Sequence, residues 1–216
     1  MNEVVKNEEV DNKELVRRSV LEIAKEAFAS YGIRTVTMDE IASAAGISKR
    51  TLYEIFKDKE SLLREIILLS QDNMREYVQK VLQDTTNVME VILLCYKFNT
   101  KRFHKIDKRF FDDLKKYPRV HSLFIRGQER DSKENVEFFK SGVEQGLFRS
   151  DINFEIVNLL VREQMSCLLD SDVYTKYPFM EVYESIMFTY LRGISTKKGL
   201  EKVEQFIEEY RKEEVE

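Results

Sequence analysis

Residues that interrupt helices are scarce in this chain of 216 residues. It holds two Pro and seven Gly, and it has no Trp. The long segments between them are rich in Leu, Glu, Lys, Ile and Arg, which favour helices. No segment alternates apolar and polar residues as a half-buried strand does. The composition therefore predicts an all-α protein, with one sizeable core or with a small domain beside a larger one.

The residue types that usually carry catalysis or bind metals are also few. The two His, His104 and His121, have no other His or Cys at the spacing of metal ligands. The chain has no glycine-rich motif of the dinucleotide-binding or Walker A type. We therefore expect no catalytic residue, no metal and no cofactor, and we do not expect an enzyme.

Cysteines are few, and long apolar segments are absent from the sequence. Cys95 and Cys167 are too few and too far apart in sequence to predict a disulfide framework, and free thiols suit a reducing cytoplasm. The sequence has neither an apolar N-terminal segment nor the run of roughly 18 apolar residues that a membrane span needs. We expect a cytoplasmic protein without a membrane partner.

The segment 37–56, TMDEIASAAGISKRTLYEIF, predicts two short helices joined by a tight turn. Thr37 and Glu40 have the spacing of a capping box, in which each side chain accepts the other residue's backbone N–H. Gly46 stands where a helix end favours positive φ, and Ser48 is a good N-cap for the next helix. A small core shared by the two helices should consist of Ile41, Ala45, Ile47, Leu52 and Ile55.

The second helix of this pair should leave polar residues facing outward, namely Lys49, Arg50, Thr51 and Tyr53. Such side chains donate hydrogen bonds to phosphates and base edges, as a helix-turn-helix does in the major groove of DNA. They are also ordinary surface residues. The pattern alone therefore leaves DNA binding and a plain helical hairpin both open.

The flanking residues carry a family resemblance. From residue 31 to 63 the chain has the sequence YGIRTVTMDEIASAAGISKRTLYEIFKDKESLL, in which Gly32 ends a first helix. This string resembles the N-terminal domain of the TetR family of transcriptional regulators, and the resemblance includes the helix expected before it. One departure is Arg50, at a position that is often small in the family. The family therefore says little about which DNA sequence is recognised.

The resemblance implies a homodimer in which each subunit has a three-helix DNA-binding domain and a larger helical regulatory domain. In the family, the regulatory domain binds a small molecule, and this binding shifts the spacing of the two DNA-binding domains. The implied partners are a double-stranded DNA operator, a second copy of the chain and a small-molecule effector. Repression is the commoner mode in the family.

The position of each polar residue predicts its contact with DNA. The N-cap Ser48 and the first turn after it should face base edges, and this turn holds Lys49, Arg50 and Thr51. Phosphates should be held by Tyr53, Lys57, Lys59 and, at the start of the preceding helix, Thr37.

The acidic residues behind the net charge of −4 lie at the two ends of the chain. Residues 1–14 hold two basic against five acidic residues, and residues 199–216 hold three against seven. Residues 15–59 hold eight basic against six acidic residues. The predicted DNA-binding segment is thus mildly basic, which suits specific contacts rather than a broad electrostatic attraction to DNA.

Hydrophobic spacing sets the expected domains and helices. A helix from about residue 12 to 31, preceded by disordered residues, and the pair at 37–56 should form a DNA-binding domain over 12–58. A long helix from 58 to about 83 should link it to a regulatory and dimerisation domain over 59–212. About nine to ten helices are expected, the later ones at 86–102, 106–115, 118–145, 152–170, 178–194 and 197–212.

The expected regulatory domain is rich in aromatic residues, which favour an apolar or aromatic effector over a sugar. The candidate pocket residues are Met74, Tyr77, Phe98, Phe103, Phe110, Phe111, Phe124 and Met165. Aromatic residues at helical spacing also fill cores, so the sequence does not decide which of these residues line a pocket.

Helices 152–170 and 178–194 carry apolar residues on more than one face. One face can pack inside the subunit and the other against a second copy, in a two-fold four-helix bundle. The candidate interface residues are Phe154, Val157, Val161, Leu168, Phe179, Tyr183, Ile186 and Tyr190. A purely intramolecular core, and hence a monomer, is the alternative.

These features together predict a ligand-responsive transcriptional regulator. It should act as a repressor that binds a near-palindromic operator as a dimer and is released by a small apolar or aromatic effector. The alternative is a helical carrier or enzyme for a small molecule, in which the helical hairpin is incidental.

Overall fold

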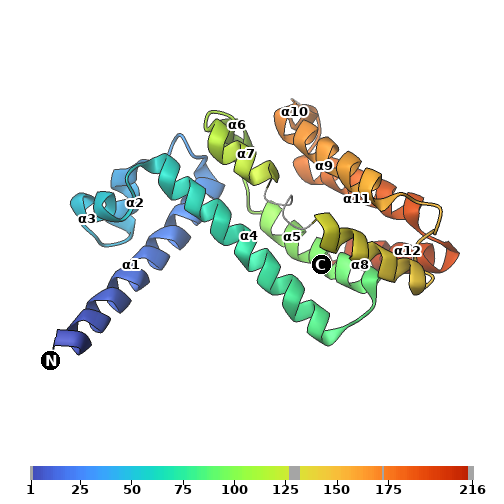
Figure 1. Cartoon of the computed structure of the whole chain (residues 1–216). Coiled ribbons are helices and arrows are strands. Elements are labelled where there is room, and N and C mark those ends of the chain that lie inside the picture. The colour runs from blue at the N-terminus through green and yellow to red at the C-terminus, as the bar shows by residue number, and fades with distance from the viewer. Residues whose placement is uncertain (1, 127–131, 172, 214–216) are drawn as a thin grey trace. The chain divides into compact units, whose positions relative to one another are not determined.

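The structure, a computed structural model, describes residues 2–126, 132–171 and 173–213, and these are mostly helical (Figure 1). In chain order the helices are α1 (Asn2–Tyr31), α2 (Met38–Ala44), α3 (Lys49–Ile55), α4 (Lys59–Asp84), α5 (Val88–Phe103), α6 (Lys108–Leu114), α7 (Pro118–Arg126), α8 (Ser132–Glu144), α9 (Phe154–Asp170), α10 (Val173–Lys176), α11 (Phe179–Ile194) and α12 (Lys197–Glu213). Within the described segments, strand-type pairing is limited to an isolated bridge between Phe148 and Ser195. The all-α prediction is confirmed.

The helices divide into two compact units. Unit 1 comprises Met1–Asp72 and Lys105–Phe124, and unit 2 comprises Asn73–His104 and Ile125–Glu216. Helix α4 crosses the division, so its first half belongs to unit 1 and its second half to unit 2. Unit 1 thus contains α6 and most of α7 besides the three N-terminal helices, although the sequence had suggested a regulatory role for everything after residue 58.

Unit 1 has a core of aliphatic and aromatic side chains. Val20, Ala24 and Phe28 recur every four residues along α1, so they form one stripe on that helix, and all three are completely buried. Other elements of the unit contribute the buried residues Ile33, Ile41, Leu52, Phe56, Leu62, Leu63, Phe110, Phe111 and Leu114. This core fixes the helices from which the candidate site is built.

Helix α6 is fastened to the end of α1 by hydrogen bonds to the backbone. Gly32 ends α1 with φ +84°, and a Cβ there would lie 3.0 Å from the Cβ of Arg109. The N–H of Asp107 donates to the carbonyl of Ala29 at 2.8 Å, and the N–H of Arg34 donates to the buried carboxylate of Asp113 at 2.8 Å. A glycine therefore allows both the positive φ and the close approach of α6.

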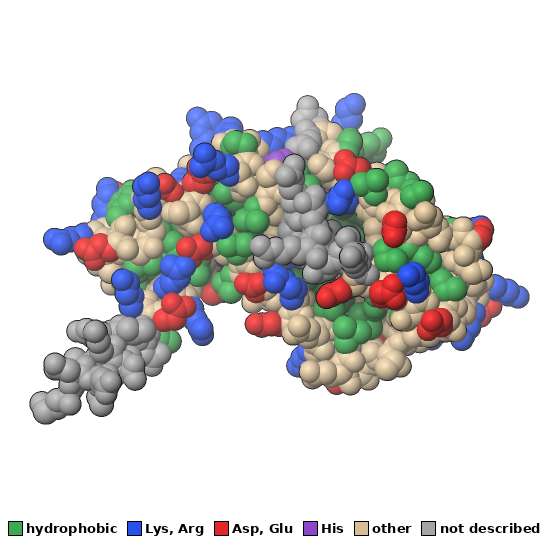
Figure 2. Space-filling view, in the orientation of Figure 1, with side chains coloured by type: hydrophobic (Ala, Val, Ile, Leu, Met, Phe, Trp, Pro, Cys, Tyr) green, Lys and Arg blue, Asp and Glu red, His purple; other side chains and the backbone are tan. Residues whose placement is uncertain are grey.

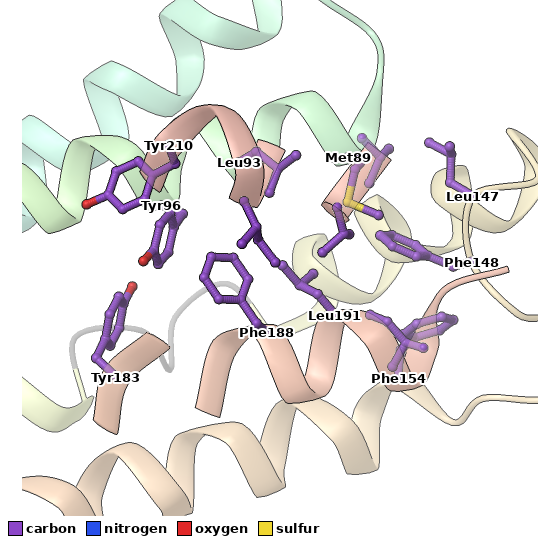
Figure 3. Packing of buried hydrophobic residues seen from close by; sticks show 14 of the residues in the cluster. Met89, Leu93, Tyr96, Leu147, Phe148, Phe154, Tyr183, Phe188, Leu191 and Tyr210 are labelled. Atoms are coloured by element: carbon purple, nitrogen blue, oxygen red, sulfur yellow. The ribbon is translucent and has the colours of Figure 1, made fainter. Parts of the chain in front are cut away.

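Unit 2 has a core made from α5, α8, α9, α11 and α12 (Figure 3). Tyr96 lies among four other aromatic rings, with centroid distances between 4.9 and 5.9 Å; these belong to Tyr183, Phe188, Phe206 and Tyr210. The Tyr96 hydroxyl donates to the carboxylate of Glu184 at 2.6 Å. Burial and this carboxylate raise the pKa of Tyr96, so its hydroxyl stays protonated and remains a donor.

The connection before α9 meets the connection before α12 in unit 2. The N–H of Arg149 donates to the carbonyl of Ile194 at 2.9 Å, and the N–H of Thr196 donates to the carbonyl of Leu147 at 3.0 Å. Gly199, in the first turn of α12, lies so close to Leu147 that a Cβ would overlap its carbonyl oxygen. The absence of a side chain at Gly199 therefore permits the packing of α12.

The observed helices differ from the sequence-based expectation in three places. Helix α1 begins at Asn2 rather than near residue 12, so the expected disorder of residues 1–11 is wrong for most of that segment. The segment has no Gly or Pro, and it contains Glu and Lys, which have a high helix propensity. The short helix α10 was not expected. In the span 118–145, where one helix was expected, the structure has α7 and α8, and residues 127–131 lie outside the described residues.

Candidate nucleic-acid interface

The start of α2 has the predicted capping box. The N–H of Glu40 donates to the hydroxyl oxygen of Thr37 at 3.2 Å, and the N–H of Thr37 donates to the carboxylate of Glu40 at 2.7 Å. Both N–H groups are thereby satisfied at the helix terminus. The donated hydrogen bonds also lower the pKa of Glu40. The first residue of the helix-turn-helix is therefore held in place by local contacts alone.

The turn between α2 and α3 is also as the sequence predicts. Gly46 has φ +66°, and the N–H groups of Gly46 and Ile47 donate to the carbonyls of Ser43 and Ala42 at 3.1 and 3.0 Å. This pair of bonds is the Schellman arrangement that ends many helices at a glycine. Ser48 then caps α3, because its hydroxyl accepts the N–H of Thr51 at 3.0 Å.

Helix α3 buries one side and exposes the other. Leu52, and Phe56 directly after the helix, are buried in the core of unit 1. Lys49 and Arg50 are exposed, and so is Tyr53, at 43%. Thr51 is half-buried. The N-terminal half of α3 therefore presents the polar residues that the sequence assigned to DNA.

The two cations at the start of α3 each have a carboxylate partner. The ammonium of Lys49 donates to Asp39 of α2 at 2.9 Å, and the guanidinium of Arg50 donates to Glu54, one turn further along α3, at 3.0 Å. The hydrogen bond that Lys49 donates to Asp39 raises the pKa of Lys49. Asp39 and Glu54 had no place in the sequence-based site, although the spacing of four residues between Arg50 and Glu54 is a detectable signal.

The predicted phosphate ligands differ in how they are engaged. The Thr37 hydroxyl donates to Glu40 at 2.9 Å, so it already takes part in the capping box. Lys59 is half-buried, its ammonium donates to the carbonyl of Ile33 at 3.0 Å, and burial lowers its pKa. Lys57 is exposed. Of the two lysines, Lys57 is thus the better placed to reach a phosphate.

Arg17 of α1 contacts both α4 and the residue that directly follows α3. Its guanidinium forms an ion pair with Glu65 of α4 and lies 5.1 Å from the centre of the Phe56 ring. A surface depression of about 320 Å³ is lined by Lys13, Glu14, Arg17, Glu54 and Ile55. None of the predicted effector-pocket residues lies in this depression. Arg17 was not predicted, because its partners are far away along the chain.

The predicted pocket residues are distributed between the two units. Phe110, Phe111 and Phe124 belong to unit 1, and the first two are buried there. Unit 2 contains Met74, Tyr77, Phe98, Phe103 and Met165. Tyr77 and Phe98 stack with their ring centroids 4.2 Å apart, and the guanidinium of Arg102 lies 5.5 Å from the centre of the Phe98 ring. Phe103 and Met165 pack against the core of unit 2.

Most of the predicted dimer residues lie in or against the core of unit 2. Phe154, Leu168 and Tyr183 are buried core residues, and Val157, Phe179 and Ile186 pack against them. Val161 and Tyr190 are half-buried. A different set of apolar residues on α9 is exposed, namely Ile156 at 54%, Leu159 at 45% and Leu160 at 47%. Periodicity had shown that α9 has two apolar faces but could not show which of them faces inward.

Neither a membrane span nor a metal cluster is found in the part of the chain that the structure describes. Its helices are too short or too polar to cross a bilayer. No group of three or more His, Cys, Asp or Glu residues there is arranged to hold a metal ion.

The geometry of α2, the turn and α3 is that of a helix-turn-helix in an all-α protein. The family described as "Bacterial regulatory proteins, tetR family" matches residues 20–66, which run from α1 into α4. The transcriptional repressor KstR2 of Rhodococcus jostii (strain RHA1) is 30% identical to this chain over 158 residues, which cover 68% of this chain and 74% of that protein. The chain therefore belongs to the TetR family.

Two further comparisons agree with this assignment. KstR2 of Mycobacterium tuberculosis (strain ATCC 25618 / H37Rv) is 28% identical over 153 residues, which cover 68% of this chain and 76% of that protein. The solved structure of the M. tuberculosis ketosteroid transcriptional regulator KstR2 shares the fold, with a TM-score of 0.52 and 24% identity over 84% of this chain and 95% of that one. The chain is a DNA-binding transcriptional regulator, and the predictions of family, fold class and function are confirmed at this level.

Proposed function

We propose that this protein is a cytoplasmic, homodimeric repressor that binds a near-palindromic operator and is released by a small apolar or aromatic effector. The observation that carries the proposal is the exposed N-terminal half of α3, held by the Thr37 and Ser48 caps on a buried Leu52. The relatives named above are repressors, which favours repression over activation.

Recognition of DNA follows from the chemistry of α3. Lys49 and Arg50 can donate to guanine O6 and N7, and Thr51 can contact either base edges or the thymine methyl group. Tyr53 and Lys57 are exposed nearby and would hold phosphates. Two copies of α3 must lie about 34–36 Å apart to enter successive major grooves, so the operator should have two related half-sites at that spacing.

Selection of bound duplexes from a random pool tests this part of the proposal. We expect an enriched near-palindrome. Lys49→Ala and Arg50→Ala should cost about 1–3 kcal/mol at particular base pairs, whereas Tyr53→Ala and Lys57→Ala should weaken binding to all duplexes, with a shallower salt dependence for Lys57→Ala. Lys140→Ala, in α8 of unit 2, is the control with the same loss of charge. A pool without an enriched sequence would refute the proposal.

The dimer contact that we propose is the exposed apolar face of α9. Ile156, Leu159 and Leu160 have the i, i+3, i+4 spacing of a single helix face, and Cys167 is exposed further along the same helix. A two-fold contact uses the same patch on both subunits, so this face would pack against its own copy. The predicted residues Val161 and Tyr190, which are half-buried, can extend the contact.

Sedimentation of the free protein tests the dimer. The wild type should sediment as a dimer at micromolar concentration, and Leu160→Glu should shift it toward the monomer mass of 25.7 kDa. Glu137→Gln, an exposed change on α8 and outside this face, should leave the dimer intact. A wild-type species at the monomer mass would contradict the proposal.

The effector site that we propose lies in unit 2, around the stacked pair Tyr77 and Phe98. Stacked rings that are half-buried can accept a flat apolar molecule with little loss of side-chain entropy. The relative KstR2 is described as a ketosteroid transcriptional regulator, and a ketosteroid is an apolar molecule of this general kind. Phe111 is less suitable as a test position, because it is buried in unit 1 and its loss would destabilise the DNA-binding helices.

Coupling between effector and DNA requires an element that is shared by the two units. Helix α4 runs through both of them, so a change in unit 2 can be transmitted along it. The effector must bind one conformation better than the other, and a coupling of about 1–3 kcal/mol would change DNA affinity by roughly 5- to 150-fold.

A thermal-shift screen of diverse apolar compounds tests the effector proposal. A compound that binds only the folded protein should raise its melting temperature, and the same compound should weaken operator binding, because the coupling is reciprocal. Phe98→Ala should reduce both responses while leaving operator binding by the free protein intact. Compounds that stabilise the protein without any effect on DNA binding would refute the regulatory part.

A further inference from the structure

The helix-turn-helix of this protein has no net charge of its own. Between Thr37 and Lys59 the chain holds four cationic residues, namely Lys49, Arg50, Lys57 and Lys59, and four acidic residues, namely Asp39, Glu40, Glu54 and Asp58. Non-specific binding to DNA comes from net positive charge that replaces counterions on the phosphates. A neutral segment attracts DNA weakly without regard to sequence, and the role of each of its carboxylates can be examined in turn.

Two of the four carboxylates have a structural role at a helix terminus. Glu40 completes the capping box of α2 with Thr37. Asp58 accepts the N–H of Ser61 at 2.7 Å at the start of α4. Donated backbone hydrogen bonds lower the pKa of both residues, as is usual for carboxylates that cap helices. Glu40 and Asp58 would be favourable here in a protein that never bound DNA.

The other two carboxylates are directed at the cations of α3. Asp39 is 60% exposed and accepts from Lys49 at 2.9 Å, and Glu54, also 60% exposed, accepts from Arg50 at 3.0 Å. Exposed ion pairs of this kind contribute about 0–1 kcal/mol to stability, so folding alone does not account for them. Blue and red side chains lie next to each other at the α2–α3 end of unit 1 in Figure 2.

We propose that Asp39 and Glu54 are specificity-determining residues, which hold Lys49 and Arg50 away from arbitrary phosphates and release them only to matching base edges. This inference rests on the proposed contact of α3 with the major groove. On random DNA, the two carboxylates repel the phosphates and cancel the charge of the two cations. Little non-specific affinity then remains.

At the operator, a guanine edge offers two acceptors to Lys49 or Arg50 and can replace the carboxylate as their partner. A wrong base pair lacks this acceptor pattern, so the ion pair with Asp39 or Glu54 would be broken without an equal replacement. The carboxylates thus penalise wrong sequences more than the right one, which is how specificity is gained by weakening undesired complexes.

The experiment compares two duplexes by fluorescence anisotropy over a range of salt concentrations. One is the duplex selected from the random pool, and the other is a scrambled duplex of the same composition. The full-length variants are Asp39→Ala and Glu54→Ala, because Asn or Gln at these positions could itself bind adenine. Asp39→Glu keeps the charge and serves as the rescue variant. Glu22→Ala removes a carboxylate that pairs with Lys25 on α1, so it is the control for net charge within unit 1.

We expect Asp39→Ala and Glu54→Ala to bind the scrambled duplex roughly three- to tenfold more tightly at low salt, with a salt dependence that is steeper by up to about one unit for each charge removed. Affinity for the selected duplex should change less, so the ratio of the two affinities should fall. Asp39→Glu should restore the ratio, and Glu22→Ala should leave it unchanged. Melting temperatures measured on the same samples should stay close to the wild-type value.

Two results would overturn the proposal. One is an unchanged affinity ratio for both alanine variants, and the other is the same effect from Glu22→Ala, which would mean that only the overall charge matters. Failure of the underlying DNA contact is a separate result, because then Lys49→Ala and Arg50→Ala would leave binding to the selected duplex intact. If those two variants lose binding while the affinity ratio of Asp39→Ala and Glu54→Ala does not move, only the present inference fails.

Discussion

The two units of this protein both use helix caps but differ in the make-up of their cores. In unit 1, polar side chains satisfy backbone groups at helix ends, as Thr37, Ser48 and Asp113 do. In unit 2, polar side chains also cap helices, as Asn87 and Asn153 do, but the core is dominated by rings that pack on rings around Tyr96. Hydrogen bonds depend strongly on direction, whereas apolar packing can rearrange at a smaller cost.

This difference suits the roles that we propose for the two units. A helix that recognises base edges must be held within a fraction of an ångström, and caps at both ends of a turn provide that precision. A core of rings can open or shift to admit a ligand while it keeps most of its buried area. The predictions below test how separate the two kinds of stabilisation are, from the largest expected effect to the smallest.

The largest effect should come from removing a buried ring in either unit. Phe28→Ala in unit 1 and Phe148→Ala in unit 2 should each cost about 3–5 kcal/mol, because both rings are fully buried and the cavity would not collapse completely. Hydrogen exchange followed by mass spectrometry should show the loss of protection mainly in the unit that carries the change. Equal loss in both units for both variants would mean that the protein unfolds as one cooperative body.

The close approach in unit 2 gives the next prediction. Gly199→Ala should destabilise the protein by about 1–3 kcal/mol or more, because the new Cβ would overlap the carbonyl of Leu147, which is backbone and cannot move aside. Gly193→Ala is the matched control in α11, since a Cβ there meets nothing within 4 Å. That control should be neutral or should stabilise by up to about 1 kcal/mol in chemical denaturation. Two substitutions with the same sign and size would contradict the packing of α12 on Leu147.

The attachment of α6 to α1 gives a prediction for unit 1. Asp113→Ala should cost about 1–3 kcal/mol, since it removes the buried carboxylate that accepts the N–H of Arg34. The exchange of amides in the turn after α1 should increase, and operator binding should weaken although residue 113 is far from α3 in the sequence. Asp112→Ala, at the exposed neighbouring position, should change stability by less than about 0.5 kcal/mol. If both variants behaved alike, α6 would not support the DNA-binding helices.

Acid should destabilise both units, but the loss of stability should depend on salt to a different extent for different carboxylates. Backbone N–H groups lower the pKa of Glu40 and Asp58 below their ordinary values of 4.5 and 3.8, and arginine side chains lower the pKa of Glu204 and Asp151 in unit 2. A carboxylate with a lowered pKa stabilises the fold above its unfolded-state pKa, and the contribution is lost as the pH falls through the folded-state value. Stability should therefore decrease below about pH 4.5.

Added salt should distinguish the carboxylates held by backbone N–H groups from those paired with arginine. This effect should be the smallest of the four that are predicted here. Salt screens the exposed ion pairs of unit 2 but has little effect on caps made by backbone N–H groups. The acid-induced loss of protection around Asp151 and Glu204 should thus become smaller at high salt, and that around the caps Glu40 and Asp58 should not. Hydrogen exchange near pH 4 at two salt concentrations measures this difference. An equal effect of salt on protection at both kinds of carboxylate would contradict the prediction.

The sequence by itself determined the local features of the DNA-binding region. The capping box at Thr37, the turn at Gly46 and the cap at Ser48 were all predicted correctly, because each depends on hydrogen bonds between residues at most five positions apart. The family resemblance and the all-α class were predictable for the same reason, since they depend on local spacing and on helix propensity along the chain.

Only the tertiary structure decided which distant residues meet. Asp113 accepts from Arg34 across 79 positions, and Arg17 pairs with Glu65 across 48, so neither contact leaves a local pattern in the sequence. The same holds for α9, where helical periodicity revealed two apolar faces. Packing against the rest of unit 2, including Phe139 of α8, buried Phe154 and Leu168 and left Leu160 exposed. A helix has no preference between two apolar faces until its neighbours cover one of them, and this choice is made by the rest of the chain.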